Sequence, residues 1–444
     1  MLVGNDIACG RLSEEALNAN FADAHPALSS EQAALEADRC FYCYDAPCVE
    51  ACPTDIDIPR FIKAIASDNV AGAARTILKS NILGGSCARV CPTEILCEQK
   101  CVHTAIEANK PVRIGALQRY ATDWQMKQDV HPFQRAPETG KKIAVVGAGP
   151  AGLACAHRLA TYGHDVTIFD RHDTLGGLNQ YGVAAYKLAD NFAQNEIDFL
   201  MKIGGISFTG NSTLGETVTL SELRDKYDGV FLGIGLAGVR RLGLEGEDTP
   251  GVMDAVEFIE TLRSQVLSEV PVGRRVVVIG GGNTAIDAAV QAKRLGADEV
   301  TLVYRRGAEH MSATKVEQEW AQTNGVILKF WFVLKKINIE NGKIKNIVFY
   351  NNASDKIEDY SSIEYTLPAD MILKAIGQTF ISGPVDKDQI LLRDGRIVVD
   401  NNGRTSLPSV YAGGDCTMGK DLTVAAVRDG RNAAEALHKE LSTS

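Results

Sequence analysis

Apolar residues follow two different rhythms along the chain, and the change falls near residue 140. Before it, the segments 58–69 (IPRFIKAIASDN) and 70–81 (VAGAARTILKSN) carry apolar residues at helical spacing, and 29–40 (SSEQAALEADRC) opens with serine, a common helix cap. After it, KIAVV (142–146) and VVVIG (276–280) are short continuous apolar runs that end in glycine. Such runs are typical of buried parallel strands. The pattern therefore predicts an α-helical amino-terminal domain followed by α/β modules.

The segment 131–140 (HPFQRAPETG) separates the two parts. Its two prolines and terminal glycine interrupt regular structure and are typical of a linker. Further strands are predicted at 395–400 and 409–415, and a final helix from about Thr423. With 444 residues the chain is expected to form about three domains.

The segment 142–170 is predicted to form strand, tight turn, helix and strand, one βαβ unit. In its turn, Gly147 makes the bend, Gly149 lets backbone approach a pyrophosphate, and Gly152 lets helix pack on strand. Asp170 ends the next strand, 21 residues after Gly149, where a carboxylate can hold ribose hydroxyls. A glycine turn that serves packing alone is the weaker alternative. This module is predicted to bind a dinucleotide.

A second βαβ unit follows at 274–306, with Gly280-Gly281-Gly282-Asn283-Thr284-Ala285 as its turn. Its second strand ends in Arg305 and Arg306 instead of an acid. Arginine at this place suits the 2′-phosphate of NADPH, so NADPH is favoured over NADH. The alternative is a solvated pair of charges at a strand end.

Cysteines concentrate in the helical part, which holds nine of the eleven. One run is Cys40-x2-Cys43-x4-Cys48-x3-Cys52-Pro53, and the other contains Cys87, Cys91, Cys97 and Cys101. C-x2-C turns and a closing Cys-Pro are typical of ferredoxin-like sites, in which the last cysteine of a run ligates a different cluster. Eight cysteines in two runs thus predict two 4Fe–4S clusters that exchange ligands between the runs. Two structural zinc sites of four cysteines each are the alternative.

Composition limits the expected cellular location and the expected binding partners. No apolar run approaches the roughly 18 residues of a membrane span, and the start lacks a secretory signal, so we expect a cytoplasmic protein with reduced thiols and no membrane partner. The net charge of −10 disfavours nucleic-acid binding. His103 could ligate zinc but is more commonly an ordinary helix or loop residue. Cys155 and Cys416 are expected to be small packing residues.

Two dinucleotide sites in one chain predict hydride transfer between nicotinamide and flavin, with FAD in the first site and Gly413-Gly414-Asp415 completing it. Flavin accepts hydride and releases electrons singly to clusters. A disulfide reductase lacks support because neither module holds a C-x2-C or C-x4-C pair, and no catalytic nucleophile is expected. The predicted fold is α/β, with two Rossmann-like domains preceded by the helical iron–sulfur domain. The predicted ranges are 1–130 (two clusters), 131–140 (linker), 141–238 and 373–444 (FAD), and 239–372 (NAD(P)H).

Together these motifs resemble a family: the flavin and iron–sulfur small subunit of bacterial dihydropyrimidine dehydrogenase and the amino-terminal half of the animal enzyme. The likeness runs from about Asp38 to the final helix. It rests on DRCFYCYDAPCVEACP, SCARVCPTEILCEQKC, IGALQRYATDW, VVGAGPAGL, GGLNQYG, VVVIGGGNTAID, LVYRRG and YAGGD. The small subunit of glutamate synthase shares most of these modules, and Tyr304-Arg305-Arg306 and HMSA are closer to it.

The resemblance implies specific site residues. One cluster would be held by Cys40, Cys43, Cys48 and Cys101, and the other by Cys52, Cys91, Cys97 and Gln118, which leaves Cys87 spare. By spacing alone, all eight cysteines are ligands and Gln118 is a surface helix residue. FAD would contact Gly147, Gly149, Pro150, Ala151, Gly152, Asp170, Gly177, Leu178, Lys187, Gly413, Gly414, Asp415 and Thr423. NADPH would contact Gly281, Gly282, Asn283, Thr284, Arg305, Arg306, Ala375 and Gly377.

Two positions depart from the family pattern. Ser312 stands where the animal enzyme has a second arginine for the 2′-phosphate, so NADH use stays open. Lys187 replaces the usual arginine and keeps the charge without the bidentate fork.

The resemblance implies an electron-input subunit of a hetero-oligomer. Its partner would be an FMN and iron–sulfur subunit that interconverts uracil or thymine and the 5,6-dihydropyrimidines. Two alternatives remain: the small subunit of NADPH-dependent glutamate synthase, and, from another class, a zinc-bearing nucleotide sensor without catalysis.

Overall fold

The computed structural model describes residues 7–107, 110–128, 130–351, 364–386 and 390–443. It forms two compact units. The larger unit comprises residues 25–180, 190–238 and 379–444, and the smaller unit comprises 1–24, 181–189 and 239–378. Each unit contains a parallel sheet with helices, which confirms the predicted α/β class. No described helix combines the length and the apolar character needed to cross a bilayer.

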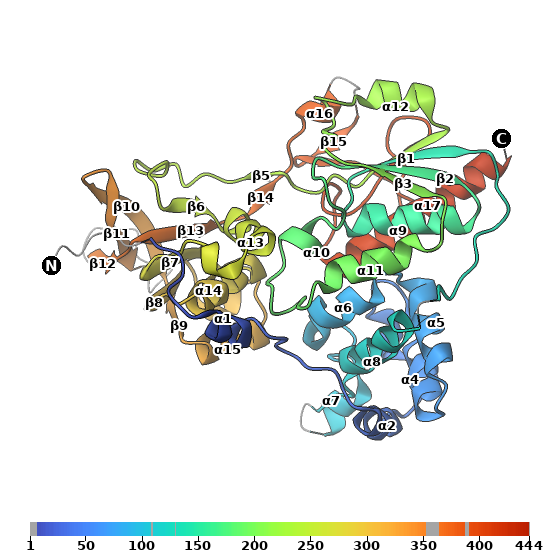
Figure 1. Ribbon diagram of the computed structural model, residues 1–444, viewed down its shortest axis with the longest axis horizontal. Helices are drawn as coiled ribbons and strands as arrows, with labels where there is room; N and C mark the ends of the chain where they lie inside the picture. Colours follow the sequence, from blue (N-terminus) through green and yellow to red (C-terminus); the bar gives the residue numbers. More distant parts are fainter. Residues whose placement is uncertain (1–6, 108–109, 129, 352–363, 387–389, 444) are drawn as a thin grey trace. The chain divides into compact units, whose positions relative to one another are not determined.

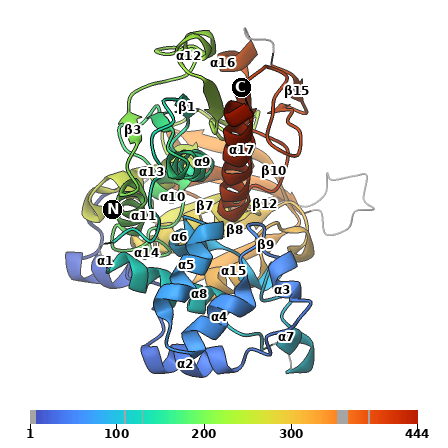
Figure 2. The same cartoon turned by 90° about the vertical axis from the view of Figure 1, so that its right-hand side faces the viewer.

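The amino-terminal part of the larger unit is helical (Figure 2). Its core contains Phe61, Ile62, Ile77 and Leu117, each at most 1% exposed. Ser29 forms a capping box with Gln32, which explains why the first of these helices begins where the sequence predicts. The helices are α2 (Ser30–Asp38), α3 (Pro47–Glu50), α4 (Ile58–Ala66), α5 (Val70–Ser80), α6 (Gly84–Val90), η1 (Thr93–Ile95), α7 (Val102–Ile106) and α8 (Ile114–Met126).

The larger unit also contains a five-stranded parallel sheet in the order β17-β4-β1-β2-β3. Its strands are β1 (Lys142–Val146), β2 (Asp165–Phe169), β3 (Ile206–Thr209), β4 (Gly229–Leu232) and β17 (Val410–Ala412). Helices α9 (Pro150–Thr161) and α17 (Thr423–Thr443) lie side by side (Figure 1), and a Cβ at Gly430 would lie 2.0 Å from the Ala151 carbonyl oxygen. The remaining elements are α10 (Leu178–Tyr181), α11 (Phe192–Met201), α12 (Leu220–Lys226), α16 (Gly383–Asp386), β15 (Leu392–Arg393) and β16 (Arg396–Ile397).

The smaller unit repeats this architecture in a second parallel sheet, of order β6-β13-β7-β8-β9. Its strands are β6 (Val252–Asp254), β7 (Arg275–Gly280), β8 (Glu299–Tyr304), β9 (Val326–Phe330) and β13 (Met371–Ala375). Its helices are α1 (Glu14–Asn20), α13 (Ala255–Ser264), η2 (Leu267–Glu269), α14 (Asn283–Arg294), η3 (Ala308–His310) and α15 (Lys315–Thr323). Two short strands, β5 (Gly238–Val239) and β14 (Gln378–Thr379), lie where the chain passes from one unit to the other.

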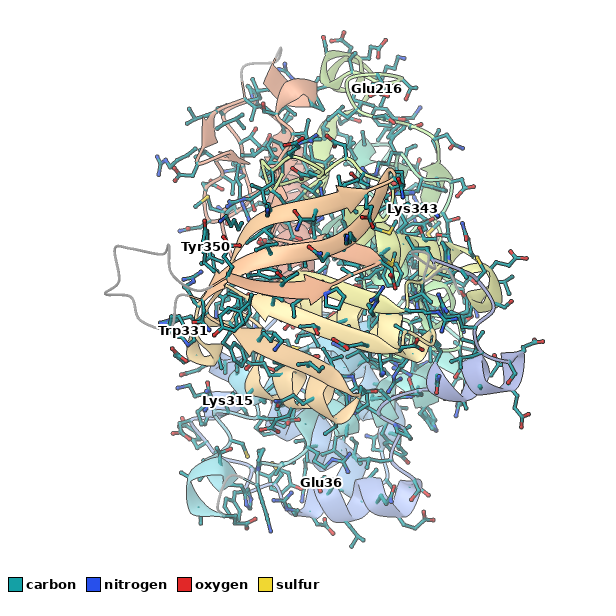
Figure 3. All side chains as sticks on the ribbon, turned by 90° about the vertical axis from the view of Figure 1, so that its left-hand side faces the viewer. Glu36, Glu216, Lys315, Trp331, Lys343 and Tyr350 are labelled. Atoms are coloured by element: carbon teal, nitrogen blue, oxygen red, sulfur yellow. The ribbon has the colours of Figure 1, made fainter. Side chains whose placement is uncertain are left out.

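A three-stranded antiparallel sheet in the smaller unit was not predicted. It consists of β10 (Phe332–Glu340), β11 (Lys343–Asn351) and β12 (Glu364–Pro368). Figure 3 shows Lys343 and Tyr350 toward opposite ends of β11. Asn341 and Gly342, with φ of 53° and 73°, form the turn between β10 and β11. An Asn-Gly pair between two apolar runs is a hairpin signal, so this element was readable from the sequence.

The compact units differ from the predicted domains at three places. The described residues before 25 pack in the smaller unit, where Leu17 and Phe21 lie in the same core as Ile259. The segment 181–189 also belongs to the smaller unit, as do residues 373–378. The predicted strand at 395–400 is shorter, with only Arg396 and Ile397 in β16.

Candidate cofactor sites

The cysteines line two cavities, and neither run closes on itself. Cys40, Cys43 and Cys48 of the first run line one cavity, of about 30 Å³, together with Cys101 of the second run. The other cavity, of about 20 Å³, is lined by Cys52, Cys87, Cys91, Cys97 and Gln118. One cysteine has therefore crossed from each run to the other. We call these the first and the second cavity.

Their chemistry fits an iron–sulfur cluster. Burial raises the pKa of Cys48 to about 12, and neighbouring thiols add to the effect. Burial likewise raises the pKa of Cys91 and Cys97 well above 9.0. Thiolates in such surroundings need a cationic group to stabilise them. In the described part of the chain, no three His, Cys, Asp or Glu side chains are arranged to hold a metal ion. The cysteines line the two cavities.

Gln118 is buried, at 8% exposure, and not on the surface as its spacing alone suggested. It lies on α8, and its Nε2 donates to the Gly84 carbonyl oxygen at 2.7 Å. With Nε2 engaged in this way, Oε1 is the atom of the side chain that can act as a ligand. The buried position and the fixed amide suit the ligand role that the family resemblance implies.

A buried polar network beside the second cavity was not predicted from the sequence. Glu196, on α11, is 2% exposed and accepts hydrogen bonds from the Gly85 and Ser86 amides at 2.8 and 3.0 Å. The Ser86 hydroxyl also donates to it. Burial raises the pKa of Glu196 to about 7, against the lowering effect of Ser86. A lone acid on the apolar face of the segment FAQNEIDFLM was the available sequence signal.

The first glycine turn lies at the carboxyl ends of β1 and β4, where the strand order of the larger sheet changes direction. In open α/β sheets this switch point is the ligand crevice. Gly147 has a φ of 102°, and a Cβ there would lie 2.2 Å from the Gly233 carbonyl oxygen. A Cβ at Gly152 would lie 1.9 Å from the Gly147 carbonyl oxygen. The turn therefore requires glycine at both positions.

Most of the predicted FAD contacts gather around this turn. A Cβ added at Gly177 would lie 2.6 Å from the Cα of Gly149. A Cβ added at Gly414 would lie 3.0 Å from the Cβ of Ala151. Burial, with Asp421 nearby, raises the pKa of Asp415 to about 6. The other predicted residues of this site in the larger unit are Pro150, which begins α9, the exposed Leu178, Gly413, and Thr423, which begins α17.

Asp170 follows β2 as predicted, and its carboxylate already stabilises the turn. Its Oδ2 accepts from the Ala148 amide at 2.7 Å, and its Oδ1 accepts from the His172 amide at 2.9 Å. Each oxygen keeps a second lone pair, so contact with ribose hydroxyls stays a prediction.

Lys187 belongs to the smaller unit, whereas the other predicted FAD residues belong to the larger unit. Its Nζ makes ion pairs with Asp287 at 2.8 Å and Glu317 at 2.6 Å. Burial alone would lower the pKa of Lys187, but these two carboxylates outweigh it and raise the pKa. The charge of the lysine is thus paired within the smaller unit, and its contact with FAD stays a prediction.

The second glycine turn occupies the matching switch point of the smaller sheet, between β7 and β13. A Cβ at Gly280 would lie 2.3 Å from the Ala375 carbonyl oxygen, and one at Gly281 would lie 2.5 Å from the Tyr304 ring. Asn283 begins α14, and its Oδ1 is buried without a hydrogen-bond partner. This oxygen is an acceptor, so a bound coenzyme would have to supply a donor, such as a ribose hydroxyl. Gly282, Thr284 and Gly377 are the other predicted residues here.

Arg305 and Arg306 are exposed directly after β8. The Arg306 guanidinium lies 5.7 Å from the centre of the Tyr304 ring. Ser312 lies beside the turn, where its hydroxyl donates to the Gly281 carbonyl at 3.4 Å. Two exposed cations beside the second glycine turn have the charge that a 2′-phosphate needs.

The remaining cysteine and histidine predictions concern packing. Cys155 and Cys416 are completely buried. His103 is 3% exposed, lies on α7, and contacts the Arg39 carbonyl through Nε2 at 2.6 Å.

Two family models match the chain. Residues 141–430 match the pyridine nucleotide-disulphide oxidoreductase model, and residues 17–130 match dihydropyrimidine dehydrogenase domain II, 4Fe-4S cluster. These matches confirm the predicted flavin, nicotinamide and iron–sulfur cofactors and the prediction of an enzyme. The zinc-bearing sensor is therefore set aside.

Curated relatives cover nearly the whole chain. The glutamate synthase [NADPH] small chain of Escherichia coli K12 is 34% identical, over 94% of this chain and 93% of the relative. The NAD-dependent dihydropyrimidine dehydrogenase subunit PreT of the same organism is 35% identical, over 94% of this chain and 96% of the relative.

Among solved structures, Mycobacterium tuberculosis FprA in complex with NADPH matches with a TM-score of 0.57 at 22% identity, covering 69% of this chain and 85% of that one. This likeness supports the fold alone. The paired dinucleotide folds, the cysteine-lined cavities and the two family matches lead to one conclusion: the chain belongs to the pyridine nucleotide-disulphide oxidoreductase family, in the flavin and iron–sulfur group that includes PreT and the glutamate synthase small chain.

Proposed function

We propose that this chain is the electron-input subunit of a dihydropyrimidine dehydrogenase. It would bind NAD(P)H in the smaller unit and FAD in the larger unit, and would deliver electrons through two 4Fe–4S clusters to an FMN-containing partner. That partner would interconvert uracil or thymine and their 5,6-dihydro forms. When bound, FAD supplies the step from hydride to single electrons.

One observation carries this proposal: two cavities with exchanged cysteines lie in the same compact unit as the first glycine turn. The proposed ligands are Cys40, Cys43, Cys48 and Cys101 in the first cavity, and Cys52, Cys91, Cys97 and Gln118 in the second. This chain's own residues bind and orient the cofactors.

The deciding experiment measures NAD(P)H-dependent uracil reduction. The anaerobically purified chain is assayed alone and then with an FMN dihydropyrimidine dehydrogenase subunit encoded beside it. We expect activity only from the mixture. Uracil reduction by the isolated chain would contradict the division of labour.

The glutamate synthase small chain is the second candidate, favoured by the 34% identity to that relative. The two candidates differ in partner. Adding a glutamate synthase large subunit in place of the FMN subunit, with glutamine and 2-oxoglutarate as substrates, separates them. Glutamate formation in that mixture, with no uracil reduction in the other, would select the second candidate.

We further propose that Arg305 binds the 2′-phosphate and that NADPH is the preferred coenzyme. Losing one charge-assisted hydrogen bond of about 1.5–3 kcal/mol weakens binding by about ten- to a hundred-fold. Arg305→Ala should weaken NADPH by that factor and leave NADH nearly unchanged. An equal loss of affinity for both coenzymes would mean that Arg305 does not bind the 2′-phosphate.

A further inference from the structure

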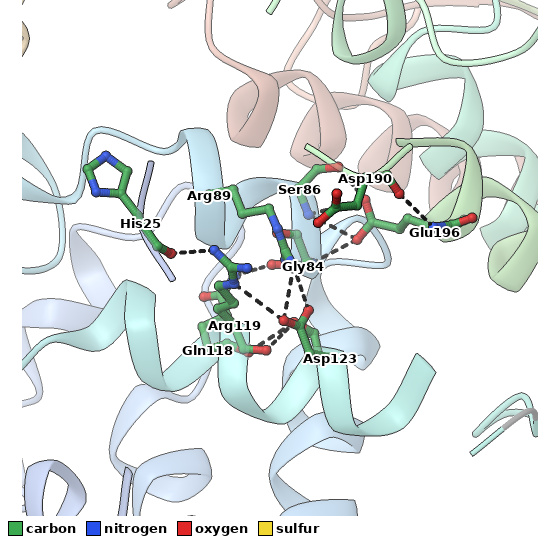
Figure 4. Close-up of polar contacts among 12 residues, drawn as sticks. His25, Gly84, Ser86, Arg89, Gln118, Arg119, Asp123, Asp190 and Glu196 are labelled. Atoms are coloured by element: carbon green, nitrogen blue, oxygen red, sulfur yellow. Dashed lines mark hydrogen bonds and ion pairs between the residues drawn. The ribbon is translucent and has the colours of Figure 1, made fainter. Parts of the chain in front are cut away.

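One peptide group joins Glu196 to Gln118. The amide of Gly85 donates to Glu196 Oε1 at 2.8 Å, and the carbonyl of Gly84, which belongs to the same peptide group, accepts from Gln118 Nε2 at 2.7 Å. Figure 4 shows these residues brought together from α6, α8 and α11. A carboxylate, a peptide and a side-chain amide thus form one continuous hydrogen-bonded chain that ends at the second cavity.

We propose that Glu196 is a positioning residue for the second cluster, which acts through the Gly84–Gly85 peptide to orient Gln118 and to strengthen its amide oxygen as an iron ligand. This inference rests on the proposed function and on the ligand role of Gln118 within it.

The direction of the effect follows from hydrogen-bond cooperativity. A carboxylate that accepts from a peptide N–H makes the carbonyl of that peptide a stronger acceptor, by about 10–30% per bond. A stronger pull on the Gln118 Nε2–H group shifts charge within that amide toward Oε1. Outer partners that polarise a ligand in this way raise its basicity toward a metal.

The hydrogen-bond donors around Glu196 favour its carboxylate form, against the effect of burial, which raises its pKa. Its three close contacts, the amides of Gly85 and Ser86 and the Ser86 hydroxyl, can all donate. Arg89 is the nearby cation, and it is itself paired with Asp123 at 2.9 Å. Cys87 is another titratable group near Glu196, and burial raises its pKa. Figure 4 shows Asp190 close by as well.

Arg89 also fixes the three helices that carry the chain of hydrogen bonds. From α6 it reaches Asp123 on α8, and its guanidinium lies 3.4 Å from the centre of the Phe192 ring on α11. The elements that carry Gln118 and Glu196 are therefore tied to α6 independently of the proposed link. Such support is what a positioning residue needs in order to act with precision.

The two glycines at the start of α6 permit the close approach. A Cβ at Gly85 would lie 2.6 Å from the Phe192 ring and 2.8 Å from Glu196 Oε1, and one at Gly84 would lie 2.7 Å from Ile77. Glycine costs about 1 kcal/mol in a helix relative to alanine, so two in succession need a reason. Here the close packing of three helices around one peptide provides it.

The test compares Glu196→Gln with Ser86→Ala in the full chain loaded with its clusters, at about pH 8.5. Glu196→Gln keeps the shape and removes the charge, whereas Ser86→Ala removes one contact and keeps the carboxylate on Gly85. The readouts are the electron paramagnetic resonance spectrum and reduction potential of each cluster and the rate of iron release to a chelator. Flavin content serves as the control for folding.

We expect Glu196→Gln to shift the spectrum and potential of the second cluster alone and to speed its iron release by about ten-fold or more. Ser86→Ala should stay close to the parent chain. If Glu196→Gln does not fold, Glu196→Asp, which keeps the charge but shortens the reach, is expected to shift the same cluster by less.

Two outcomes would overturn the inference. If Glu196→Gln leaves the second cluster unchanged while Gln118→Ala alters it, Glu196 has no role there and the proposed function stands. If Gln118→Ala also leaves both clusters unchanged, Gln118 is not a ligand, and the inference and that part of the proposed ligand set are both wrong.

Discussion

The two cavities share thiol chemistry but lie in different surroundings. The cysteines of the first cavity are half-buried, and the neighbouring aromatic residues Phe41 and Tyr44 are exposed, at 57% and 106%. In the second cavity Cys52, Cys87 and Cys97 are buried, and a polar network that contains Glu196 lies beside it. Solvent exposure and hydrogen bonding both tune the potential of a cluster. We therefore expect clusters in the two cavities to differ in reduction potential, although both cavities are lined mainly by cysteines.

The largest expected effect tests the exchange of cysteines. Cys101→Ser should remove the same cluster as Cys43→Ser, and Cys52→Ser should remove the same cluster as Cys97→Ser, because each pair lines one cavity. Every variant should retain about half of the iron. Iron analysis and electron paramagnetic resonance of the four proteins provide the measurement. If Cys101→Ser instead removes the same cluster as Cys97→Ser, each cysteine run holds its own cluster and the proposed exchange of ligands is wrong.

The next effect is on the pH dependence of the free energy of unfolding, through Glu196 beside the second cavity. Burial raises the pKa of Glu196 from 4.5 to about 7, so the folded chain binds more protons than the unfolded chain between these values. This contribution to stability is fully present below pH 4.5 and is lost as the pH rises to about 7, by about 3 kcal/mol. Glu196→Gln should flatten that part of the curve in denaturant titrations at several pH values. An identical pH dependence in both proteins would mean that Glu196 does not titrate differently on folding.

A smaller effect is expected from Gln118→Ala. The first cluster should be unchanged, and the second should lose iron at least about ten-fold faster, equivalent to about 1.4 kcal/mol, because one ligand is missing. Chelator competition measures this rate. Gln125→Ala, a buried glutamine on the same helix that binds the Val130 carbonyl, is the matched control and should release iron at the parent rate.

The smallest effect is expected from Cys87→Ala. Cys87 lines the second cavity and is 2% exposed, yet the proposed ligand set leaves it spare. Replacing a buried thiol by a methyl group should cost about 1 kcal/mol through a small cavity and leave the iron content unchanged. Loss of half of the iron would show that Cys87 is a ligand and that the second site uses cysteine where we propose glutamine.

Local signals in the sequence predicted much of the fold. The helices at 58–66 and 70–80 and the two glycine turns follow from apolar spacing and from the need for positive φ or close backbone approach at Gly147 and Gly280. The hairpin at Asn341-Gly342 had a readable signal that was missed. Residues 7–24 pack against a sheet that lies more than 200 residues later in the chain. No local signal in the sequence predicts this packing, because it depends on residues that are distant in the chain.

By itself, the sequence determined the types of chemistry present: two dinucleotide turns, eight clustered cysteines, and the strand-end charges Asp170 and Arg305. The spacing of the residues left the grouping of the cysteines open, and the family resemblance implied the grouping that the two cavities show. Only the tertiary structure decided that Gln118 is buried and that one peptide links it to Glu196. The physical reason is distance along the chain. A turn is specified by neighbouring residues, whereas a cavity and a buried carboxylate are specified by helices that meet only after the whole core has packed.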